Sequence, residues 1–482
     1  MKNVTILLVF ILALFLFTPG INTLSSETEE KGDWSSPEVV STESTANAYR
    51  GVIAVDHFGT IHIAWKDKSD YQGIGTNWHI CYKNKPKGGN WTTTEIVSTE
   101  STGDGNCLSM VVDQNVTVHI VWKDNSNYHN IGSNWHIFYK NKPRGGNWTT
   151  TEIVSTESTG NCGCPSLAVD NNNTVHVTWA DDSEIYTSGS DEDIFYRSRL
   201  KSGYWTDYEL VSTDSTADSL EPSIDIDSEN TVYIVWEEMI GTTIPHNRYN
   251  IIFKQKKQGN IWLPSENVST QNTGQSVSPI IKVDPDNVVH CIWADNSAVD
   301  PFDTDFDVFY RNRSVDGIWS QIEVVSKDSR SDVSFPTLAV DHNKTVHVAW
   351  VQTVPFTYGK IYYSQKKIGG SWSDYEIASN KTDRDASFPN IFVDSIGKVH
   401  LVWWIVASVL NEDYDCPACE NFYIDQWAVV YNYRIPAEHS NDNESTDNGN
   451  PSDNHNSNTT PGFEVYLLFC GILLFILFKM KK

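Results

Sequence analysis

Positive charge is scarce in this chain of 482 residues. Lys and Arg number 35 against 62 Asp and Glu, which gives a formal net charge of −27, and only ten of the cations are Arg. Phosphate backbones are bound by clustered Lys and Arg, so this balance argues against a nucleic-acid partner. Cysteine is also scarce, since 8 residues are too few for a fold held together by disulfides. By contrast, 18 Trp, 21 Tyr and 19 Phe can fill a large core, which excludes wholesale disorder.

The start of the chain predicts export. Residues 1–24 have a short basic beginning, an apolar run from 4 to 17 and a break at Pro19-Gly20, which is the layout of a secretory signal peptide. A retained N-terminal anchor is the alternative. Ten Asn-x-Ser/Thr sequons fit a glycoprotein in the same compartment. They begin at Asn90, Asn115, Asn147, Asn172, Asn267, Asn312, Asn343, Asn380, Asn443 and Asn458.

The end of the chain predicts attachment to a membrane. Residues 437–460 are polar and cannot order themselves by burial, so they are expected to form a disordered stalk. Residues 461–482 contain an apolar run from 465 to 478 and a basic end, which predicts a membrane anchor with the rest of the chain on the outer surface. Pro461-Gly462-Phe463 and the polar linker before it resemble the PGF-CTERM sorting tails of archaeal surface proteins. That resemblance implies a tail that is removed and replaced by a lipid.

Between these ends lies one repeat, which is marked by two series of tryptophans. The first series runs at intervals of 57 residues and a final 53, and the second precedes it by 31 residues in each unit. The first series is Trp65, Trp122, Trp179, Trp236, Trp293, Trp350 and Trp403. The second series is Trp34, Trp91, Trp148, Trp205, Trp262, Trp319 and Trp372.

Each unit holds four short strand-like runs separated by Gly, Asn and Asp turns. Four strands in 50 to 60 residues are typical of a propeller blade. The array begins with a lone fourth strand at 38–42 and ends after a third strand at 428–433, so the N-terminal strand can complete the last blade. The sequence therefore predicts an all-β protein whose residues 33–436 form a seven-bladed β-propeller of four-stranded blades, closed by an N-terminal outer strand and followed by a C-terminal membrane helix. A solenoid of stacked units is the alternative.

The phrase Ala-Val-Asp-x-x-x-x-Val-His-x-x-Trp, as in 339–350, resembles the sialidase-like (BNR/Asp-box) propeller superfamily. The Asp-box itself is degenerate, because its nearest match at 314–319 is one residue short. The family holds a sugar carboxylate with three Arg and acts through a Tyr–Glu pair and an Asp. The resemblance makes Arg50, Arg330 and Arg384 candidates for the Arg trio. No Tyr–Glu pair can be assigned, so the sequence favours a protein that is not an enzyme.

Residues found in every blade are expected to be structural. An Asp ends the first strand of all seven blades, where its side chain can bond backbone amides two residues on. A His lies in the second strand of six blades, with Tyr233 in the remaining one, and is expected to pack between blades with its ring bonded.

Function is expected on the face where loop lengths vary, which carries the crossovers between blades and the loops joining second to third strands. Acidic residues gather there two positions after the first-series Trp, at Asp67, Asp124, Asp181, Glu238 and Asp295. Clustered carboxylates suit Ca²⁺, although no segment has the spacing of a known calcium loop, and a solvated acidic rim is the alternative. Aromatics on the same loops suit the stacking of sugars, and the candidates are Tyr71, Trp78, Tyr128 and Trp135.

The positions of the cysteines predict two disulfide bonds. A bridge from Cys107 to either Cys162 or Cys164 would join neighbouring blades, which suits a protein outside the cell. Cys416 and Cys419 are expected to close a loop within an insertion of the last blade.

Three functions fit these observations. The first is a surface-anchored, non-catalytic propeller that binds a glycan or a protein through its variable acidic face. The second is a divergent sialidase-like glycoside hydrolase, and the third is a structural protein of the cell envelope.

Overall fold

The computed structural model describes residues 33–436, apart from 186–190, 244–245, 258–260, 271–273, 298–304, 328, 330, 354–358, 383 and 411–422. The chain divides into two compact units, residues 1–436 and 437–482. The predicted signal peptide, stalk and tail lie outside the described residues. In the described part of the chain, no helix is long and apolar enough to cross a membrane.

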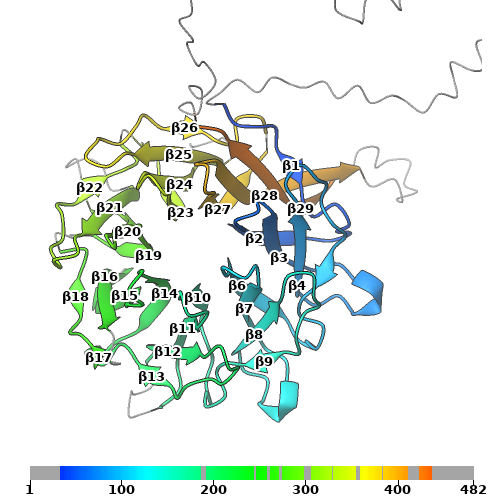
Figure 1. The fold of residues 1–482 in the computed structure, drawn as a ribbon, viewed down its shortest axis with the longest axis horizontal. Helices are drawn as coiled ribbons and strands as arrows, with labels where there is room; N and C mark the ends of the chain where they lie inside the picture. The colour runs from blue at the N-terminus through cyan, green and yellow to red at the C-terminus, as the bar shows by residue number, and fades with distance from the viewer. Residues whose placement is uncertain are drawn as a thin grey trace, which may run out of the picture. The chain divides into compact units, whose positions relative to one another are not determined.

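Seven antiparallel sheets are arranged around a common axis, one for each repeat (Figure 1). Blade 1 consists of β2 (Ala48–Val55), β3 (Ile61–Asp67), β4 (His79–Lys85) and β5 (Glu95–Ile96). Blade 2 consists of β6 (Gly105–Val112), β7 (Val118–Asp124), β8 (His136–Lys142) and β9 (Glu152–Ile153). Blade 3 consists of β10 (Ser166–Val169), β11 (Val175–Asp181), β12 (Asp193–Arg199) and β13 (Glu209–Leu210). Blades 4 and 5 consist of β14 (Ser219–Ile226), β15 (Val232–Thr243), β16 (His246–Lys257), β17 (Ile261–Trp262), β18 (Glu266–Asn267); and β19 (Ser276–Val283), β20 (Val289–Asp295), β21 (Asp307–Arg313), β22 (Glu323–Val324). Blades 6 and 7 consist of β23 (Val333–Val340), β24 (Val346–Gln352), β25 (Lys360–Lys366), β26 (Glu376–Ile377); and β27 (Ala386–Val393), β28 (Val399–Leu410), β29 (Tyr423–Arg434), β1 (Glu38–Val39).

This architecture confirms the predicted all-β propeller with seven four-stranded blades. Blade 4 has one additional short pairing, because both β17 and β18 lie against β16. The helices of the described residues are two single 3-10 turns, η1 (Tyr71–Gly73) and η2 (Tyr128–Asn130).

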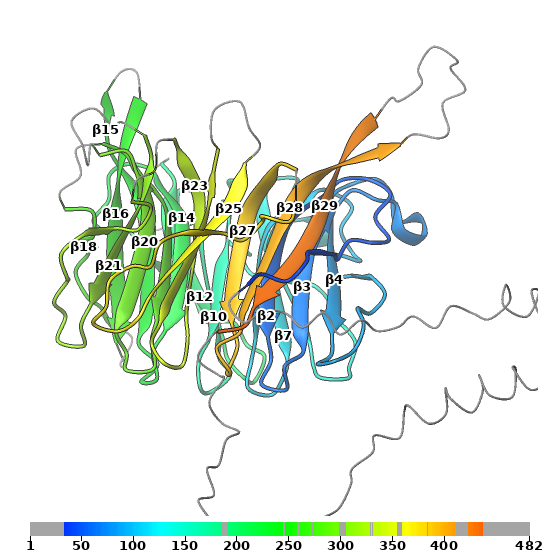
Figure 2. The same cartoon turned by 90° about the horizontal axis from the view of Figure 1, so that it is seen from above.

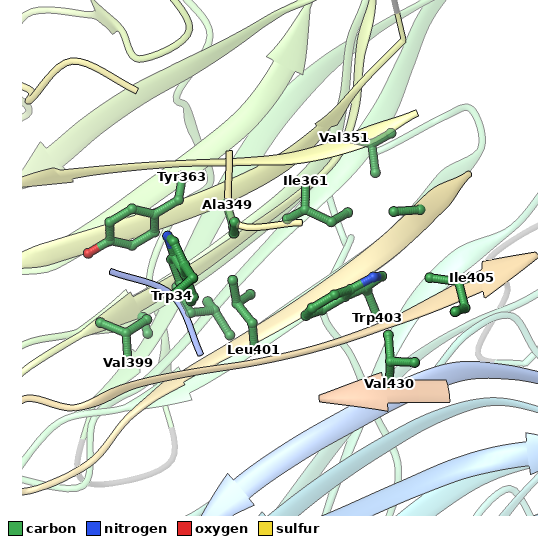
Figure 3. Packing of buried hydrophobic residues seen from close by; sticks show 14 residues of the cluster. Trp34, Ala349, Val351, Ile361, Tyr363, Val399, Leu401, Trp403, Ile405 and Val430 are labelled. Carbon is green, nitrogen blue, oxygen red and sulfur yellow. The ribbon is translucent and has the colours of Figure 1, made fainter. Parts of the chain in front are cut away.

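The ring is closed by the N-terminal strand, as predicted. β1 pairs with β29 in antiparallel register, with Glu38 opposite Tyr431, and so becomes the outer strand of blade 7. Trp34, just before β1, is buried between blades 6 and 7 and meets the Tyr363 ring edge-on at 5.2 Å between centroids (Figure 3). Closure leaves no outer edge of blade 7 open to another chain.

The hydrophobic core consists of seven clusters, and each lies between two neighbouring blades. All seven tryptophans of the first series are fully buried, and each cluster contains one of them. A single blade therefore has no core of its own, since both of its faces are covered by its neighbours.

The second Trp series explains how neighbouring blades are held at their outer edges. Glu38 accepts hydrogen bonds from Lys85 Nζ at 2.6 Å and from Trp91 Nε1 at 3.0 Å, both of which belong to the next blade. The same three-residue bridge joins Glu95, Glu152, Glu209 and Glu266 to a Lys or Arg and a Trp of the following blade. We call this contact the interblade bridge.

The repeated Asp and His are structural, as expected. In blade 1, Asp56 Oδ1 accepts the amides of Phe58 and Thr60, and its Oδ2 lies 3.4 Å from His62 Nε2. The other ring nitrogen of His62 lies 2.6 Å from the Tyr82 hydroxyl. Blade 4 has Tyr233 in place of the His, and its hydroxyl donates directly to Asp227 at 2.7 Å.

The propeller has two different faces. Turns between first and second strands and hairpins between third and fourth strands form one face, here called the lower face. Crossovers between blades and hairpins between second and third strands form the upper face. The long β15–β16 and β28–β29 hairpins both project from the upper face (Figure 2).

Removal of β1 tests the closure. We expect the fragment 43–436 to melt well below the fragment 33–436, because Lys85 and Trp91 lose Glu38 and the edge of β29 loses its partner. Within 33–436, Trp34→Ala should lower the free energy of unfolding by about 3–5 kcal/mol, the usual cost of emptying a buried Trp site. The exposed Tyr204→Ala is the control. Equal melting temperatures for the two fragments would contradict closure through β1.

The His–Asp pairs predict a dependence of stability on pH. Burial lowers the pKa of His62 and His400. Because the unfolded chain binds protons at these residues below about pH 6.5, the free energy of unfolding should fall as pH drops below that value. The double change His62→Tyr/Tyr82→Phe copies blade 4 and should weaken this pH dependence. Urea denaturation between about pH 8 and pH 5.5, the range in which His titrates, measures it. The exposed His57→Gln is the control substitution.

A second loss of folding stability is expected at acidic pH. Burial by itself raises the pKa of Asp56, but hydrogen bonds from the Thr60 amide and from His62 outweigh it and hold that pKa below its usual value. The stability from this carboxylate is present above about pH 4 and is lost as the pH falls through the lower, folded-state pKa.

Candidate functional site

The innermost strand of the blades carries a break in register close to the upper face. In blade 1 the pairing of β2 with β3 shifts between Tyr49 and Val52, and five further blades shift at the equivalent place. One residue per blade lies at this position and lines the mouth of the central channel. We call these seven residues the bulge ring; they are Arg50, Cys107, Cys164, Glu221, Ser278, Phe335 and Phe388.

The backbone of the bulge ring is unusual. Six of its members have a positive φ, between 41° at Cys107 and 56° at Ser278. This left-handed region costs a residue other than glycine about 1–3 kcal/mol. Bulges commonly re-aim a side chain next to a functional site. Six blades thus share one backbone conformation here, while the side chain changes from Arg to Cys, Glu, Ser or Phe.

The residue that follows the bulge is also constrained. Five blades place a Pro there, which suits an inner strand whose free edge faces the channel. Blade 1 has Gly51 instead, because a Cβ at that position would lie 2.8 Å from Val402 Cγ2. The mouth is a cavity of about 370 Å³, within the range of small-ligand sites, and the channel below it has a further cavity of about 350 Å³.

Blades 1 and 2 form a cationic corner beside the mouth, of which Arg50 lines the cavity itself. Arg50 lies at the ring, and Lys66 and Lys123 each follow the first-series Trp of their blade. Lys66 Nζ donates to Asn106 Oδ1 at 2.8 Å. Burial, assisted by repulsion from Arg50, lowers the pKa of Lys66 to about 8. Burial also lowers the pKa of Lys123. The corner therefore combines a fixed guanidinium with a Lys whose charge can change near neutral pH.

An aromatic wall stands beside the cationic corner. The Arg50 guanidinium lies 4.4 Å from the centroid of the Phe388 ring, which stacks on Phe335 at 3.6 Å. Tyr49 meets Trp404 at 5.1 Å and Trp427 at 5.2 Å between centroids. Among the described residues, Arg50 Nε and Trp404 Nε1 are buried donors without a hydrogen-bond partner. Four further Trp indoles of the core share this property, so among these donors Arg50 Nε, which lines the mouth, is the candidate for bonding a ligand.

Blade 4 supplies the acidic side of the mouth. Glu221 lies at the ring and is exposed, whereas Glu237, on β15, is buried and accepts the Ser278 amide at 2.5 Å. Burial raises the pKa of Glu237 to about 7, which the amide opposes and repulsion from Glu221 reinforces. A carboxyl of this kind exchanges a proton near neutral pH.

The two cysteines of the bulge ring are joined to each other. Cys107 and Cys164 form a disulfide between blades 2 and 3, with 5.1 Å between their Cα atoms. Arg50 Nη1 lies 3.2 Å from Cys107 Sγ. The sequence left open whether Cys107 pairs with Cys162 or with Cys164, and the structure has the bridge to Cys164. Cys162 is a buried thiol whose Sγ lies 3.2 Å from Asp181 Oδ2. Cys416 and Cys419 lie outside the described residues.

The predicted acidic residues are placed differently from the expectation of an open rim. Asp67, Asp124, Asp181 and Asp295 are buried at the ends of their second strands. Each accepts the indole N–H of the first-series Trp two residues before it, at 2.9 to 3.2 Å, and Glu238 does the same in blade 4 at 3.1 Å. A ligand would have to open these bonds to reach them, so the geometry gives their ligand-binding role no support.

The predicted aromatics divide into two groups. Trp78 and Trp135 border the cationic corner, with Lys66 Nζ 4.7 Å from the first ring and Lys123 Nζ 5.2 Å from the second. Tyr71 instead donates to Asp67 Oδ2 at 3.0 Å, and Tyr128 packs against Phe138. Their part in ligand binding stays a prediction.

The predicted Arg trio is not assembled by the described residues. Arg50 lies in the mouth, but Arg330 falls outside the part that is described. Arg384 lies in the crossover before β27 and does not line the mouth cavity. Within the described ranges, no group of three or more His, Cys, Asp or Glu side chains is arranged to hold a metal ion. Ca²⁺ binding stays a prediction.

Sequence reasoning missed Lys66, Lys123, Glu237 and most of the bulge ring. The signal was present, because the residue after the first-series Trp reads Lys, Lys, Ala, Glu, Ala, Val and Trp from blade 1 to blade 7. A position whose residue changes from blade to blade, while the residues around it repeat, indicates that one backbone conformation carries different side chains.

Comparison with known proteins supports the fold. No family model matches the chain, and no curated protein matches it. Among solved structures, polysaccharide lyase Uly1 is 8% identical, with a TM-score of 0.51, over 86% of this chain and 94% of the lyase. An alpha-L-arabinanase of Penicillium chrysogenum is 10% identical over 70% of this chain and 99% of its own, with a TM-score of 0.46. The NanB sialidase of Streptococcus pneumoniae is 9% identical over 83% of this chain and 70% of its own, with a TM-score of 0.42. At these identities the likeness to the lyase concerns the fold alone, and the chain is a seven-bladed propeller whose site has to be judged from its own residues.

The disulfide is testable without a ligand. Cys107→Ser/Cys164→Ser should lower the free energy of unfolding by about 4 kcal/mol, the value expected for a loop of this length. A thiol reductant should lower the melting temperature of the unchanged protein and leave that of the double variant where it is. A reductant effect of equal size in both proteins would contradict a stabilising role of this bridge.

Proposed function

We propose that this protein is a non-catalytic receptor on the outer cell surface that binds a saccharide at the mouth of its central channel. The observation that carries the proposal is the bulge ring, where six blades share one strained backbone conformation and the seven positions present five kinds of side chain. Strain of this kind is commonly kept at functional sites.

The chemistry of the mouth suits a sugar. The C–H face of a pyranose ring packs against aromatic side chains such as Phe335 and Phe388, while its hydroxyls need donors and acceptors around the rim. Arg50 Nε brings a donor that has no partner among the described residues, and Glu221 brings an exposed acceptor. The cationic corner adds a preference for a sugar that carries an acidic group.

The location rests on the ends of the chain. The proposed signal peptide at 1–24, the stalk at 437–460 and the tail at 461–482 would hold the propeller outside the cell. A disulfide between two blades suits that compartment, since such bonds persist in oxidising surroundings. Surface proteolysis of intact cells, followed by detection of the released propeller, tests this part of the proposal.

One observation favours the divergent glycoside hydrolase as a second candidate. A carboxyl with a pKa of about 7, as at Glu237, is suited to act as a general acid near neutral pH. A hydrolase of this kind also needs a second carboxylate at a fixed separation across the bond that is cleaved, and Glu221 is the nearest candidate for it. Turnover that is abolished by Glu237→Gln would favour this candidate over the receptor.

The test is a ring-to-glycine scan of the fragment 33–436, which contains every described strand of the propeller. A positive φ suits glycine, so Arg50→Gly and Phe388→Gly remove ligand contacts and should leave the free energy of unfolding within about 1 kcal/mol of the parent. Calorimetric titration against a panel of neutral and acidic oligosaccharides should then give an affinity at least about tenfold lower for both variants, equivalent to about 1.4 kcal/mol.

Ser278→Gly is the matched control, because it lies in the same ring on the far side of the mouth from the cationic corner. The titration is repeated with Ca²⁺ and with a chelator, which tests the calcium prediction. A sugar whose affinity is the same for all three variants would show that the mouth is not its site. Absence of binding to every sugar would move the assignment to a protein ligand or to a structural role in the envelope.

A further inference from the structure

The lower face carries exposed apolar side chains at the tips of its outer hairpins. These hairpins join third to fourth strands at 86–90, 143–147, 200–204, 257–261, 314–318 and 367–371. The exposed fractions of their apolar side chains are 75% for Tyr204, 63% for Ile261, 66% for Val315, 70% for Ile318 and 69% for Ile368. On the upper face, the large apolar residues that are most exposed among those described are Ile240 at 48% and Phe335 at 37%. The apolar tips are therefore a property of one face.

The same hairpin tips are basic in a chain that is strongly acidic. They contain one carboxylate, Asp316, and five exposed cations, which are Lys87, Arg144, Lys201, Lys257 and Lys367. The net charge of the whole chain is −27, so this concentration of cations runs against the composition. Three of the tips, those of the hairpins at 200–204, 257–261 and 367–371, each carry both a cation and an exposed apolar side chain.

The chain also leaves the propeller on this face. β29 ends at Arg434, opposite Val399 at the start of β28, and Trp34 pairs with the same Arg434. The predicted membrane segment begins near residue 465, after a polar stretch that starts at 437. If this stretch is the disordered stalk that its composition predicts, its root-mean-square span is about 30 Å. A membrane that holds the tail would thus be within reach of the lower face.

We propose that the lower face docks on the anionic lipid surface of the membrane into which the chain's own tail is predicted to insert. Lys and Arg at the tips would meet lipid phosphates, and Tyr204, Ile318 and Ile368 would enter the boundary between headgroups and acyl chains. The apolar tips are spread over several blades and do not form one continuous patch. That arrangement fits a planar interface better than a protein partner, which needs a contiguous core of contact.

The tether makes weak contacts sufficient. Linking the propeller to the membrane turns docking into an intramolecular event with a high effective concentration, so individually weak tips act together. Docking in this way would turn the upper face, with the channel mouth, away from the cell. This inference concerns a different face from the proposed saccharide site and does not depend on it.

The experiment uses the fragment 33–436, expressed without N-glycosylation because sequons begin at Asn90 and Asn147 in the same hairpins. A C-terminal histidine tag and nickel-chelating lipid reproduce the tether, and untethered fragment is measured beside it. Co-sedimentation compares vesicles of phosphatidylcholine and phosphatidylglycerol with vesicles of phosphatidylcholine alone. We expect binding of the untethered fragment to the anionic vesicles only, weakening as salt is added.

Two sets of variants separate charge from apolar insertion. Lys87→Glu/Lys201→Glu/Lys257→Glu and Tyr204→Ser/Ile318→Ser/Ile368→Ser should each lower the partition coefficient at least about tenfold. Lys327→Glu/Ile240→Ser is the matched control on the upper face, and melting temperatures check that all variants are folded. The proposal is overturned if the fragment ignores anionic vesicles, or if the lower-face variants partition as the control does. For the tethered fragment, protection of the lower-face tips from a surface-labelling reagent is expected, and equal labelling of both faces would also overturn it.

Discussion

Every part of this structure depends on one constraint, which is that a blade can bury its two faces only against its neighbours. The seven hydrophobic clusters all lie between blades, so no blade is complete alone. The interblade bridges work at the outer edges for the same reason, because each joins a Glu of one blade to a cation and usually a Trp of the next. A ring with one blade missing would expose two such surfaces at once.

That constraint also explains why the fold could be predicted so fully from the sequence. Residues that make the same interblade contact must recur at the same interval, so Trp65 and Trp91 and their equivalents reveal both the period and the number of blades. The lone strand at the start of the chain then indicates how the ring closes. These features are set by local pattern and by counting, and neither requires knowledge of side-chain packing.

The site could be predicted only in part, for a physical reason. The acidic residue two positions after the first-series Trp of five blades, such as Asp67, was assigned to the loops of the variable face, yet it is buried as the partner of an indole N–H. Lys66 was overlooked although it is next to Asp67, because the sequence does not show that its side chain reaches Asn106 of the next blade, beside the bulge ring. Arg50 was chosen through a family resemblance, and the bulge that aims it into the mouth has no mark in a single repeat.

The bulge ring has a consequence for how such a protein can change. The backbone at six of these seven positions is set by strand pairing and by the residue that follows, as at Gly51 and Pro389, and is the same for Glu221 as for Phe388. Ligand preference can therefore be altered one blade at a time while the scaffold stays constant. Five of the seven positions lie outside the Cys107–Cys164 disulfide, and at these five related propellers can acquire new specificities through single substitutions.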